Sequence, residues 1–204
     1  MSKSRKENAA GAVRFVEEVK GILAVQLYDA RTCRAIISEA ERLNDWGAAE
    51  VGVEEDDDAW GSAVEPETRL ASAFTPALNS PIARRFDKRV NGVIKPLVMQ
   101  SWGVRFRRHS GTHLIRYAPG GFYVPHTDAG LDESDRGFTV ICYLNDDFEG
   151  GRTSFPPLRY SVSPRPGKAV IFPATYLHCA EPVISGEKYV IVTWLMGREP
   201  IQWF

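Results

Sequence analysis

The second half of the chain consists of short hydrophobic runs separated by turn residues, and this pattern limits the possible folds most. After Trp102 the runs are rich in β-branched and aromatic residues, which are typical of strands. Clusters rich in glycine, proline or other turn-forming residues separate them at 118–121, 145–151, 164–167 and 185–186. The predicted strands are Thr112–Tyr117, Phe138–Leu144, Thr153–Phe155, Ala169–Phe172 and Lys188–Leu195. Short strands at this spacing predict an antiparallel sandwich or barrel.

The first half of the chain has helical periodicity instead. From Asp29, a residue suited to a helix N-cap, apolar residues recur at positions 33, 36, 37, 40 and 43. A second helix is predicted to begin at Ser80-Pro81, and Pro96 is expected to kink or split it. We therefore expect a mainly β (α+β) fold, with the early helices packed on the outside of one sheet.

Composition and charge fit one cytoplasmic domain. The chain has 204 residues, 44% of them hydrophobic, so we expect residues 1–204 to form a single domain with a sizeable core. The formal net charge of −1 gives no overall field that attracts nucleic acid or an anionic membrane. The longest apolar run, Tyr189–Met196, is too short to span a bilayer, and the N-terminus has no apolar signal segment. We expect no nucleic-acid or membrane partner, and oligomeric state is not readable from this pattern.

The cysteines indicate neither a disulfide framework nor a zinc site. Cys33, Cys142 and Cys179 are odd in number and widely spaced, and none belongs to a CxxC pattern. Buried free thiols are the expected state, which is consistent with a reducing compartment.

Two charged clusters each allow two interpretations. Residues 51–61 contain an acidic run at 54–58 followed by Trp60. This segment is either a solvated loop or a lid that folds over a bound substrate, with Trp60 as its apolar contact. The basic cluster at 105–109 is either a solvated strand edge or a site for a substrate carboxylate or an acidic peptide.

The sequence His126-Thr127-Asp128 follows a turn rich in glycine and proline and is half of a candidate metal site. A step of two residues along a strand returns a side chain to the same face, so His126 and Asp128 can both point into a barrel. A third ligand would come from a distant strand, and His178 is the remaining histidine of the later strand region. Two imidazoles and one carboxylate suit Fe(II) enzymes that bind a chelating co-substrate and oxygen. An ordinary turn and a hydrogen-bonded core histidine remain alternatives at this point.

Lys188 begins the run KYVIVTWL, which is apolar on both faces and therefore resembles a central, buried strand. An unpaired ammonium group is costly to bury, so Lys188 needs an anionic partner. The sequence offers no obvious acidic residue for this role. The carboxylate of a ligand is the better candidate.

Taken in order, these motifs resemble the Fe(II)- and 2-oxoglutarate-dependent oxygenases of the prolyl 4-hydroxylase-like branch. The resemblance covers about residues 112–196, whereas residues 1–110 match only in having helical support elements. It rests on Tyr117-Ala-Pro-Gly-Gly, Tyr123, His126-x-Asp128, Tyr143-Leu144-Asn145, Gly150-Gly151-Arg152-Thr153-x-Phe155, Pro166-Gly167-Lys168-Ala169, His178, Lys188 and Trp194. It implies a double-stranded β-helix (jelly roll), with a helical support region at 1–110 and the catalytic core at 111–198.

The resemblance also implies roles for single residues. His126, Asp128 and His178 would ligate Fe(II), and Lys188 would pair with the distal carboxylate of 2-oxoglutarate. These charges balance, because Fe(II) and Lys188 carry three positive charges against one on Asp128 and two on 2-oxoglutarate.

Further contacts to the co-substrate are expected because lysine offers a point charge where many relatives have the planar fork of arginine. Tyr143 and Thr153 are expected to donate hydrogen bonds to the carboxylate, and Tyr117 is a further co-substrate contact implied by the resemblance. His113 shares a strand face with Tyr117 and is a candidate substrate contact.

The implied activity is that of a 2-oxoglutarate-dependent dioxygenase that uses O2 and hydroxylates an unactivated C–H bond, with ascorbate as a candidate further cofactor. The substrate is either a peptidyl or protein residue, or a free amino acid or natural-product biosynthetic intermediate. Rival hypotheses are a non-catalytic cupin-like binding module and a protein-interaction domain that uses the acidic run. Conversion of 2-oxoglutarate to succinate would separate an enzyme from a binding module.

Overall fold

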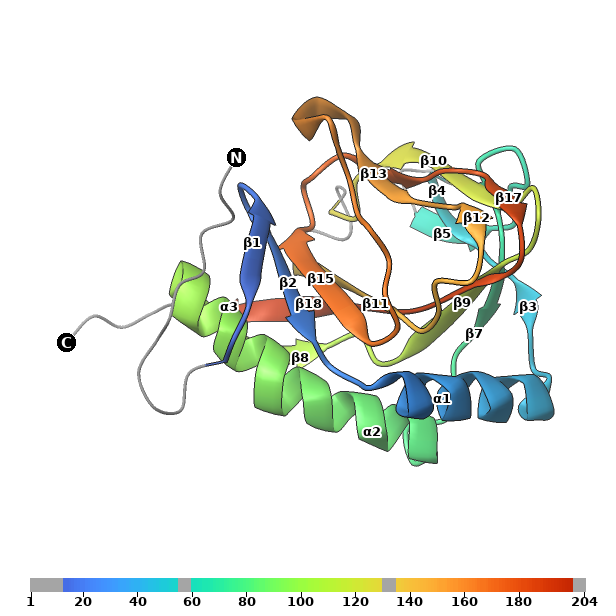
Figure 1. The fold of residues 1–204 in the computed structure, drawn as a ribbon. Helices are drawn as coiled ribbons and strands as arrows, with labels where there is room; N and C mark the ends of the chain where they lie inside the picture. The colour runs from blue at the N-terminus through green and yellow to red at the C-terminus, as the bar shows by residue number, and fades with distance from the viewer. Residues whose placement is uncertain (1–12, 55–59, 130–134, 200–204) are drawn as a thin grey trace.

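The computed structural model describes residues 13–54, 60–129 and 135–199, and its main feature is a pair of facing antiparallel sheets (Figure 1). The major sheet runs in the order β1 (Val16–Val19), β2 (Ile22–Gln26), β15 (Lys168–Pro173), β11 (Arg136–Tyr143), β18 (Lys188–Glu199), β9 (His113–Tyr117), β7 (Ser72–Phe74) and β3 (Gly47–Ala48), and β8 (Arg105–His109) also pairs with β18. The minor sheet runs in the order β14 (Tyr160–Ser161), β13 (Thr153–Phe155), β16 (His178–Ala180), β10 (Phe122–His126) and β6 (Arg69–Leu70). Two separate pairs are β12 (Glu149–Gly150) with β17 (Val183–Ser185), and β4 (Val51–Glu54) with β5 (Trp60–Ala63). This arrangement is the jelly roll that the sequence predicts.

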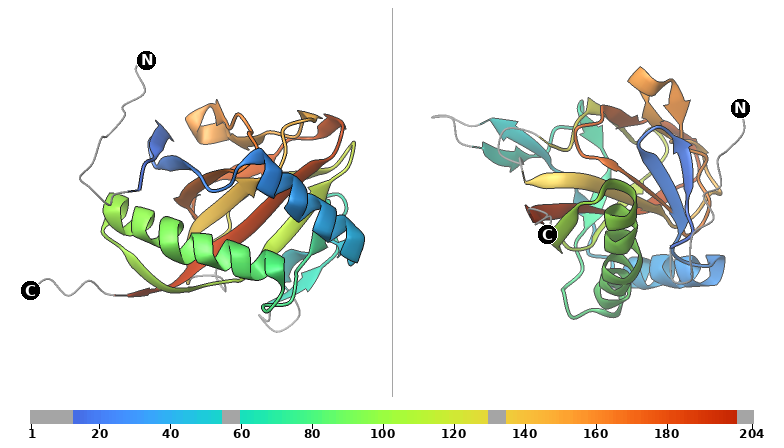
Figure 2. Two further views of the ribbon diagram at one scale, coloured as in Figure 1. Left: turned by 60° about the horizontal axis from the view of Figure 1, so that its bottom comes forward. Right: turned by 90° about the vertical axis from the view of Figure 1, so that its left-hand side faces the viewer.

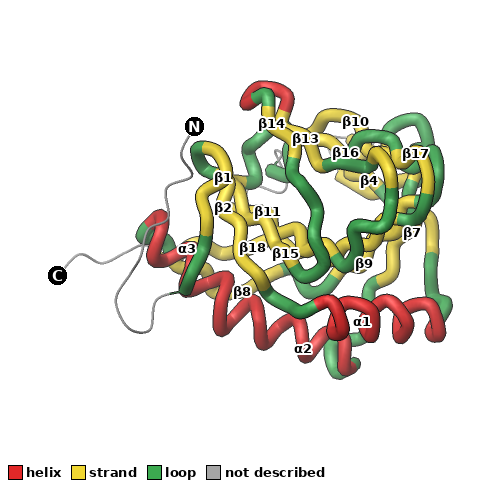
Figure 3. Tube along the Cα trace, viewed as in Figure 1, coloured by secondary structure: helices red, strands yellow, loops and turns green. Residues whose placement is uncertain are grey.

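The helices lie on the outer side of the major sheet, apart from the short 3-10 helix η3 (Pro156–Leu158) (Figures 2 and 3). They are α1 (Ala30–Leu43), α2 (Pro81–Arg89), the π-helical segment η2 (Val90–Ile94) and α3 (Lys95–Trp102). No helix among the described residues is long and apolar enough to cross a membrane.

The two predicted helix starts are confirmed at the level of their caps. The Asp29 carboxylate accepts a hydrogen bond from the Thr32 N–H at 2.7 Å, and the Ser80 hydroxyl oxygen accepts from the Ala83 N–H at 3.2 Å. The predicted effect of Pro96 is also confirmed, because the turn before it widens to a π-helix that separates α2 from α3. Proline lacks the N–H that a regular helix would use there.

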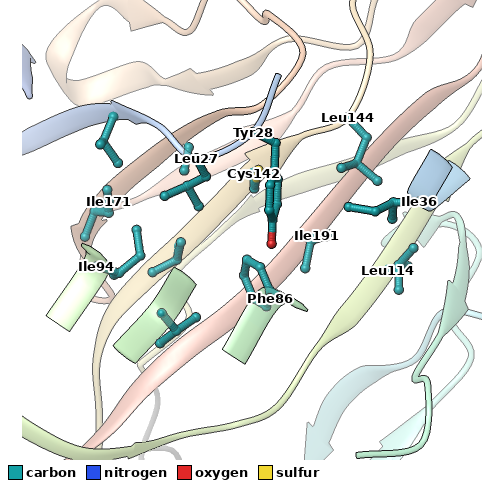
Figure 4. Packing of buried hydrophobic residues seen from close by; sticks show 14 of the residues in the cluster. Leu27, Tyr28, Ile36, Phe86, Ile94, Leu114, Cys142, Leu144, Ile171 and Ile191 are labelled. Carbon is teal, nitrogen blue, oxygen red and sulfur yellow. The ribbon is translucent and has the colours of Figure 1, made fainter. Parts of the chain in front are cut away.

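The major sheet is buried on both faces, so alternate residues of its strands belong to two different hydrophobic layers. Leu23 and Val25 of β2 pack toward the helices, whereas Ile22 and Ala24 face the minor sheet. Figure 4 shows the helix-side layer, in which Phe86 of α2 packs among residues of the sheet. The inner layer lies between the two sheets and surrounds the site described below.

All five predicted strands are present, with Lys188–Leu195 inside the central strand β18, which pairs with β11 and β9. The expectation of a helical region at 1–110 needs correction, since this part also supplies β1–β8. Residues 22–25 form a continuous apolar run without alternation, which periodicity cannot assign to a strand. The other early strands have two to five residues, which is too short for a reliable pattern.

A substitution at Gly167 tests how much its close contact with Tyr28, just before α1, contributes to stability. Its φ of +79° lies in the left-handed region, and a Cβ there would lie 1.9 Å from the Tyr28 carbonyl oxygen. We expect Gly167→Ala to lower the free energy of unfolding by about 3 kcal/mol or more. Gly92→Ala is the control, because its Cβ would meet no atom within 4 Å and alanine favours helix, so stability should stay equal or rise. Equal denaturation midpoints for the two variants would contradict this account.

Candidate metal centre

The pairing of two short strands brings the candidate metal ligands together. His126 ends β10 and His178 begins β16, and the register places these two residues directly opposite each other. Asp128 follows two residues later, and its backbone N–H donates to the Ala174 carbonyl at 2.9 Å. The Nε2 atoms of His126 and His178 lie 3.6 and 3.4 Å from the Asp128 carboxylate oxygens. One ligand atom from each residue therefore lies within 4.8 Å of the others.

Backbone hydrogen bonds orient both imidazole rings. The Nδ1 atom of His126 lies 2.8 Å from the Val124 carbonyl oxygen, and that of His178 lies 3.0 Å from the Tyr176 carbonyl oxygen. Because a carbonyl can only accept, each Nδ1 carries a proton, and in the neutral ring each Nε2 keeps its lone pair for a metal ion. The Tyr123 ring stacks on the His126 ring at 3.6 Å between centroids, which further fixes its plane.

Burial and charge set the protonation states of the centre. Burial raises the pKa of Asp128, but the contacts with His126 and His178, which act when these rings are protonated, and the hydrogen bond from Thr139 outweigh it, so the net shift is downward. Burial lowers the pKa of His178, despite the opposing effect of the Asp128 charge. Near neutral pH the centre therefore offers an ionised carboxylate and a neutral His178 imidazole, which are the forms that bind metal ions.

The donor set fits ferrous iron. Two imidazole nitrogens and one carboxylate on one side of a cavity form the facial arrangement of non-haem Fe(II) oxygenases, which leaves other coordination positions for a chelating co-substrate and oxygen. Each of the three candidate ligands is also oriented by a hydrogen bond to a neighbouring group, at the Val124 carbonyl, the Thr139 hydroxyl or the Tyr176 carbonyl.

Lys188 lies in the same cavity and is only 1% exposed. Its ammonium group donates to the Gly151 carbonyl oxygen at 2.7 Å and lies 4.9 Å from the centre of the Tyr117 ring. Among the described residues it forms no ion pair, and burial lowers the pKa of Lys188 to about 7 despite the opposing effect of the Glu181 charge. This buried ammonium is therefore available to a carboxylate of a ligand.

The remaining predicted co-substrate contacts lie around Lys188 in two layers. Tyr117 and Thr153 line the cavity. Tyr143 is fully buried behind them, and its hydroxyl donates to the Thr153 hydroxyl oxygen at 2.6 Å. Tyr143 therefore reaches the cavity through Thr153, whose own hydroxyl proton is left to donate to a ligand. The roles of these residues in co-substrate binding stay predictions.

The cavity has a volume of about 840 Å³ and includes residues that sequence reasoning did not single out. His113, Ile115 and Tyr117 line it from one face of β9, as alternation predicts. Two of the missed residues are arginines: the guanidinium carbon of Arg136 lies 3.9 Å from the centre of the Trp194 ring, and that of Arg69 lies 4.8 Å from the centre of the Tyr123 ring. Arg69 belongs to a strand of two residues, which gives no sequence signal.

The two charged clusters differ in their relation to the cavity. The β4–β5 hairpin lines its mouth through residues 51, 52, 61 and 62. Residues 55–59 and the side chains of Glu54 and Trp60 lie outside the described part, so the lid stays a prediction. In the basic cluster, Phe106 packs in the helix-side core. The arginines at 105, 107 and 108 are exposed on β8 and are not among the described residues that line the cavity. This placement favours a solvated strand edge.

Thr139 provides a test of the metal centre that leaves its ligands intact. Its hydroxyl donates to Asp128 Oδ2 at 2.6 Å, and both residues are buried. We expect Thr139→Val to weaken Fe(II) or Mn(II) binding by roughly 10- to 100-fold, as for other partners of metal ligands. Anaerobic metal titration measures the change. Thr127→Val is the control, because this exposed hydroxyl bonds only the Ala129 carbonyl and its loss should leave affinity unchanged.

Several known proteins with similar sequences or structures carry prolyl hydroxylase names. A protein of Acanthamoeba polyphaga mimivirus, provisionally named a prolyl 4-hydroxylase, is 31% identical over 134 residues, which cover 53% of this chain and 55% of that protein. The prolyl 4-hydroxylase subunit alpha-1 of Gallus gallus is 29% identical over 62% of this chain and 27% of its own length. The chain thus spans about half or less of these relatives. A Trichoplax adhaerens prolyl hydroxylase, solved with a peptide fragment of hypoxia inducible factor, has the same fold. The TM-score is 0.70 and the sequence identity 13%, and the match covers 87% of this chain and 84% of that one.

The family model of the 2OG-Fe(II) oxygenase superfamily matches residues 112–196. This segment contains all three candidate metal ligands and Lys188, which the structure gathers in one cavity. Together with the relatives, these findings show that residues 112–196 are similar to the 2OG-Fe(II) oxygenase superfamily and to proteins that carry prolyl 4-hydroxylase names.

Proposed function

We propose that this protein is an Fe(II)- and 2-oxoglutarate-dependent dioxygenase that hydroxylates an unactivated C–H bond of a peptidyl or protein residue. The observation that carries this proposal is the buried ammonium group of Lys188, which shares a cavity with the His126, Asp128 and His178 centre. A metal site alone would not need this cation. A co-substrate that chelates the metal through one end and carries a carboxylate at the other end explains both features.

Each group of the cavity has a definite task under this proposal. The two histidines and Asp128 would hold Fe(II), which when bound supplies the oxygen chemistry with 2-oxoglutarate as its reductant. The Lys188 ammonium neutralises and orients the distal carboxylate, and the Thr153 hydroxyl donates a hydrogen bond to it. Apolar side chains of the inner layer, such as Ile115 and Val190, line the cavity and limit the access of water.

Two observations support a peptidyl substrate. The cavity of about 840 Å³ opens beside the β4–β5 hairpin and is larger than a 2-oxoglutarate molecule needs. The similar Trichoplax protein was solved with a peptide, and the two curated relatives carry prolyl hydroxylase names. A free amino acid or a natural-product intermediate is the alternative substrate class.

The remaining parts of the proposal concern context. We place the protein in the cytoplasm, which is supported by the three cysteines, all free, two of them buried. Residues 1–204 are proposed to act as one domain, since the helices of the first half and the strands of the second share one hydrophobic layer. Ascorbate is proposed only as a reductant that maintains the ferrous state.

Oxygen-dependent turnover tests the function directly. Incubation with Fe(II), 2-oxoglutarate and ascorbate should give succinate, and mass spectrometry should detect a gain of one oxygen on proline-containing peptides but not on free amino acids.

Lys188→Met should raise the KM for 2-oxoglutarate on the order of a hundredfold, because the buried carboxylate then lacks its partner. The control is Lys95→Met. It also removes an ammonium group, but Lys95 donates to the Arg107 carbonyl and is not among the described residues that line the cavity. An unchanged KM in Lys188→Met would show that the carboxylate is held elsewhere.

Binding of 2-oxoglutarate should also depend on pH through Lys188. Burial lowers the pKa of this ammonium to about 7, whereas a bound carboxylate favours its protonated form. Above pH 7 binding must therefore take up a proton, and the Kd should rise by up to roughly tenfold per pH unit. Anaerobic titration of the metal-loaded protein measures this slope. Arginine stays protonated, so Lys188→Arg should bind with little change over the same range, and an equal slope in both proteins would rule out Lys188 as the source.

A further inference from the structure

A chain of hydrogen bonds runs from the surface of α2 through the major sheet to the cavity. It begins at Asp87, whose side chain is 57% exposed and whose Oδ1 atom lies 2.9 Å from Nε2 of His109 on β8. His109 is only 10% exposed, so its imidazole is nearly enclosed by protein. This pair lies on the helix side of the sheet, opposite the face that lines the cavity.

The chain then passes through β18 and the turn that joins β8 to β9. Nδ1 of His109 lies 3.0 Å from the Thr193 hydroxyl oxygen and accepts from the Gly111 N–H at 3.2 Å. The Thr193 hydroxyl, which is completely buried, lies 3.3 Å from the Ser110 hydroxyl. Thr193 and the 110–111 turn therefore carry the contact from the helix side to the edge of the cavity.

At its far end the chain holds two cavity residues through Ser110. The backbone N–H of Trp194 donates to the Ser110 hydroxyl oxygen at 3.1 Å, and Nε2 of His113 lies 3.2 Å from the Ser110 carbonyl oxygen. The His113 and Trp194 rings lie 5.4 Å apart, and both line the cavity. The buried indole N–H of Trp194 has no acceptor among the described residues. The orientation of the indole therefore decides whether a bound ligand can accept a hydrogen bond from it.

One assignment of protons satisfies the side-chain contacts of this chain, although the Gly111 carbonyl oxygen, 3.3 Å from Nδ1 of His109, then receives no hydrogen bond from that ring. His109 donates from Nε2 to Asp87 and accepts at Nδ1 from Thr193 and Gly111, while Ser110 donates to Thr193 and accepts from Trp194. His113 donates from Nε2 to the Ser110 carbonyl, which leaves its Nδ1 to accept from the Thr75 hydroxyl at 3.2 Å. Asp87 selects this arrangement, because its carboxylate can only accept.

We propose that Asp87 and His109 are positioning residues for the wall of the cavity formed by His113 and Trp194. The inference rests on the proposed function in one respect, namely that this cavity receives the substrate. Neither residue is among the described residues that line the cavity, so each would act only through Thr193 and Ser110. The prediction is a defect in substrate binding that leaves the metal centre and Lys188 unaffected.

Four variants test this proposal. Asp87→Ala removes the acceptor of the His109 hydrogen bond. It should raise the KM for the peptide substrate by roughly three- to tenfold, the effect of losing one such hydrogen bond. Asp87→Asn keeps an acceptor oxygen and should restore the KM. Thr193→Val interrupts the chain at its centre without changing the size of the side chain, and should repeat the Asp87→Ala effect. Lys88→Ala is the control, since Lys88 is exposed on the same helix and lies outside the chain.

Kinetic and spectroscopic measurements separate positioning from loss of stability. The Kd for 2-oxoglutarate and the rate of uncoupled succinate formation should stay unchanged in all four variants. Equal peptide KM values in wild type, Asp87→Ala and Thr193→Val would overturn the proposal, as would an Asp87→Asn variant as impaired as Asp87→Ala.

A readout that needs no turnover keeps this test independent of the proposed function. The indole N–H resonance of Trp194, identified in a 1H–15N spectrum by its loss in Trp194→Phe, should shift in Asp87→Ala and Thr193→Val and return in Asp87→Asn. If the wild-type protein shows no oxygenase activity but these shifts occur, the proposed function fails and the positioning role stands. If activity is present and the resonance does not respond, the positioning role fails alone.

Discussion

The antiparallel pairing of β10 with β16 is the interaction on which the site depends. It sets His126 opposite His178 although more than fifty residues separate them in the sequence, and it brings Asp128 between them. The imidazole planes are then fixed by carbonyl groups of their own segments, at Val124 and Tyr176. A shift of register by one residue would turn one ring to the opposite face of the sheet. The pairing of these two strands therefore determines both the orientation of the two rings and the geometry of the candidate metal site.

The central strand β18 connects this site with the rest of the molecule. Its inward residues, Lys188, Val190 and Trp194, line the cavity, and its outward residues, such as Ile191 and Thr193, pack toward the helices. Alternation therefore makes one strand responsible for both the cation in the cavity and the contact with the helical layer. The helices stabilise the sheet from behind, and their polar side chains can influence the cavity without reaching it.

Much of this arrangement could be predicted from the sequence because the relevant signals are local. The Asp29 and Ser80 caps, the break at Pro96 and the five predicted strands depend on neighbouring residues, and the structure contains them all. The gathering of His126, Asp128 and His178 needed the ordered motifs as well, since their spacing alone cannot exclude an ordinary turn. Strands such as β6 were missed because two residues carry no periodicity, and the cavity position of Arg69 was missed with them.

The buried ammonium explains why a local pattern could reveal a ligand. A lysine at the start of a two-sided buried strand violates the normal rule for charged residues. The contacts within reach of its ammonium group are the Gly151 carbonyl and the rings of Tyr117 and Tyr143. Those contacts stabilise a cation less than a carboxylate does, which is why burial lowers the pKa of Lys188 to about 7. Under the proposed function, binding of 2-oxoglutarate would relieve the cost of burying Lys188 and so couple the stability of the barrel to occupancy of its cavity.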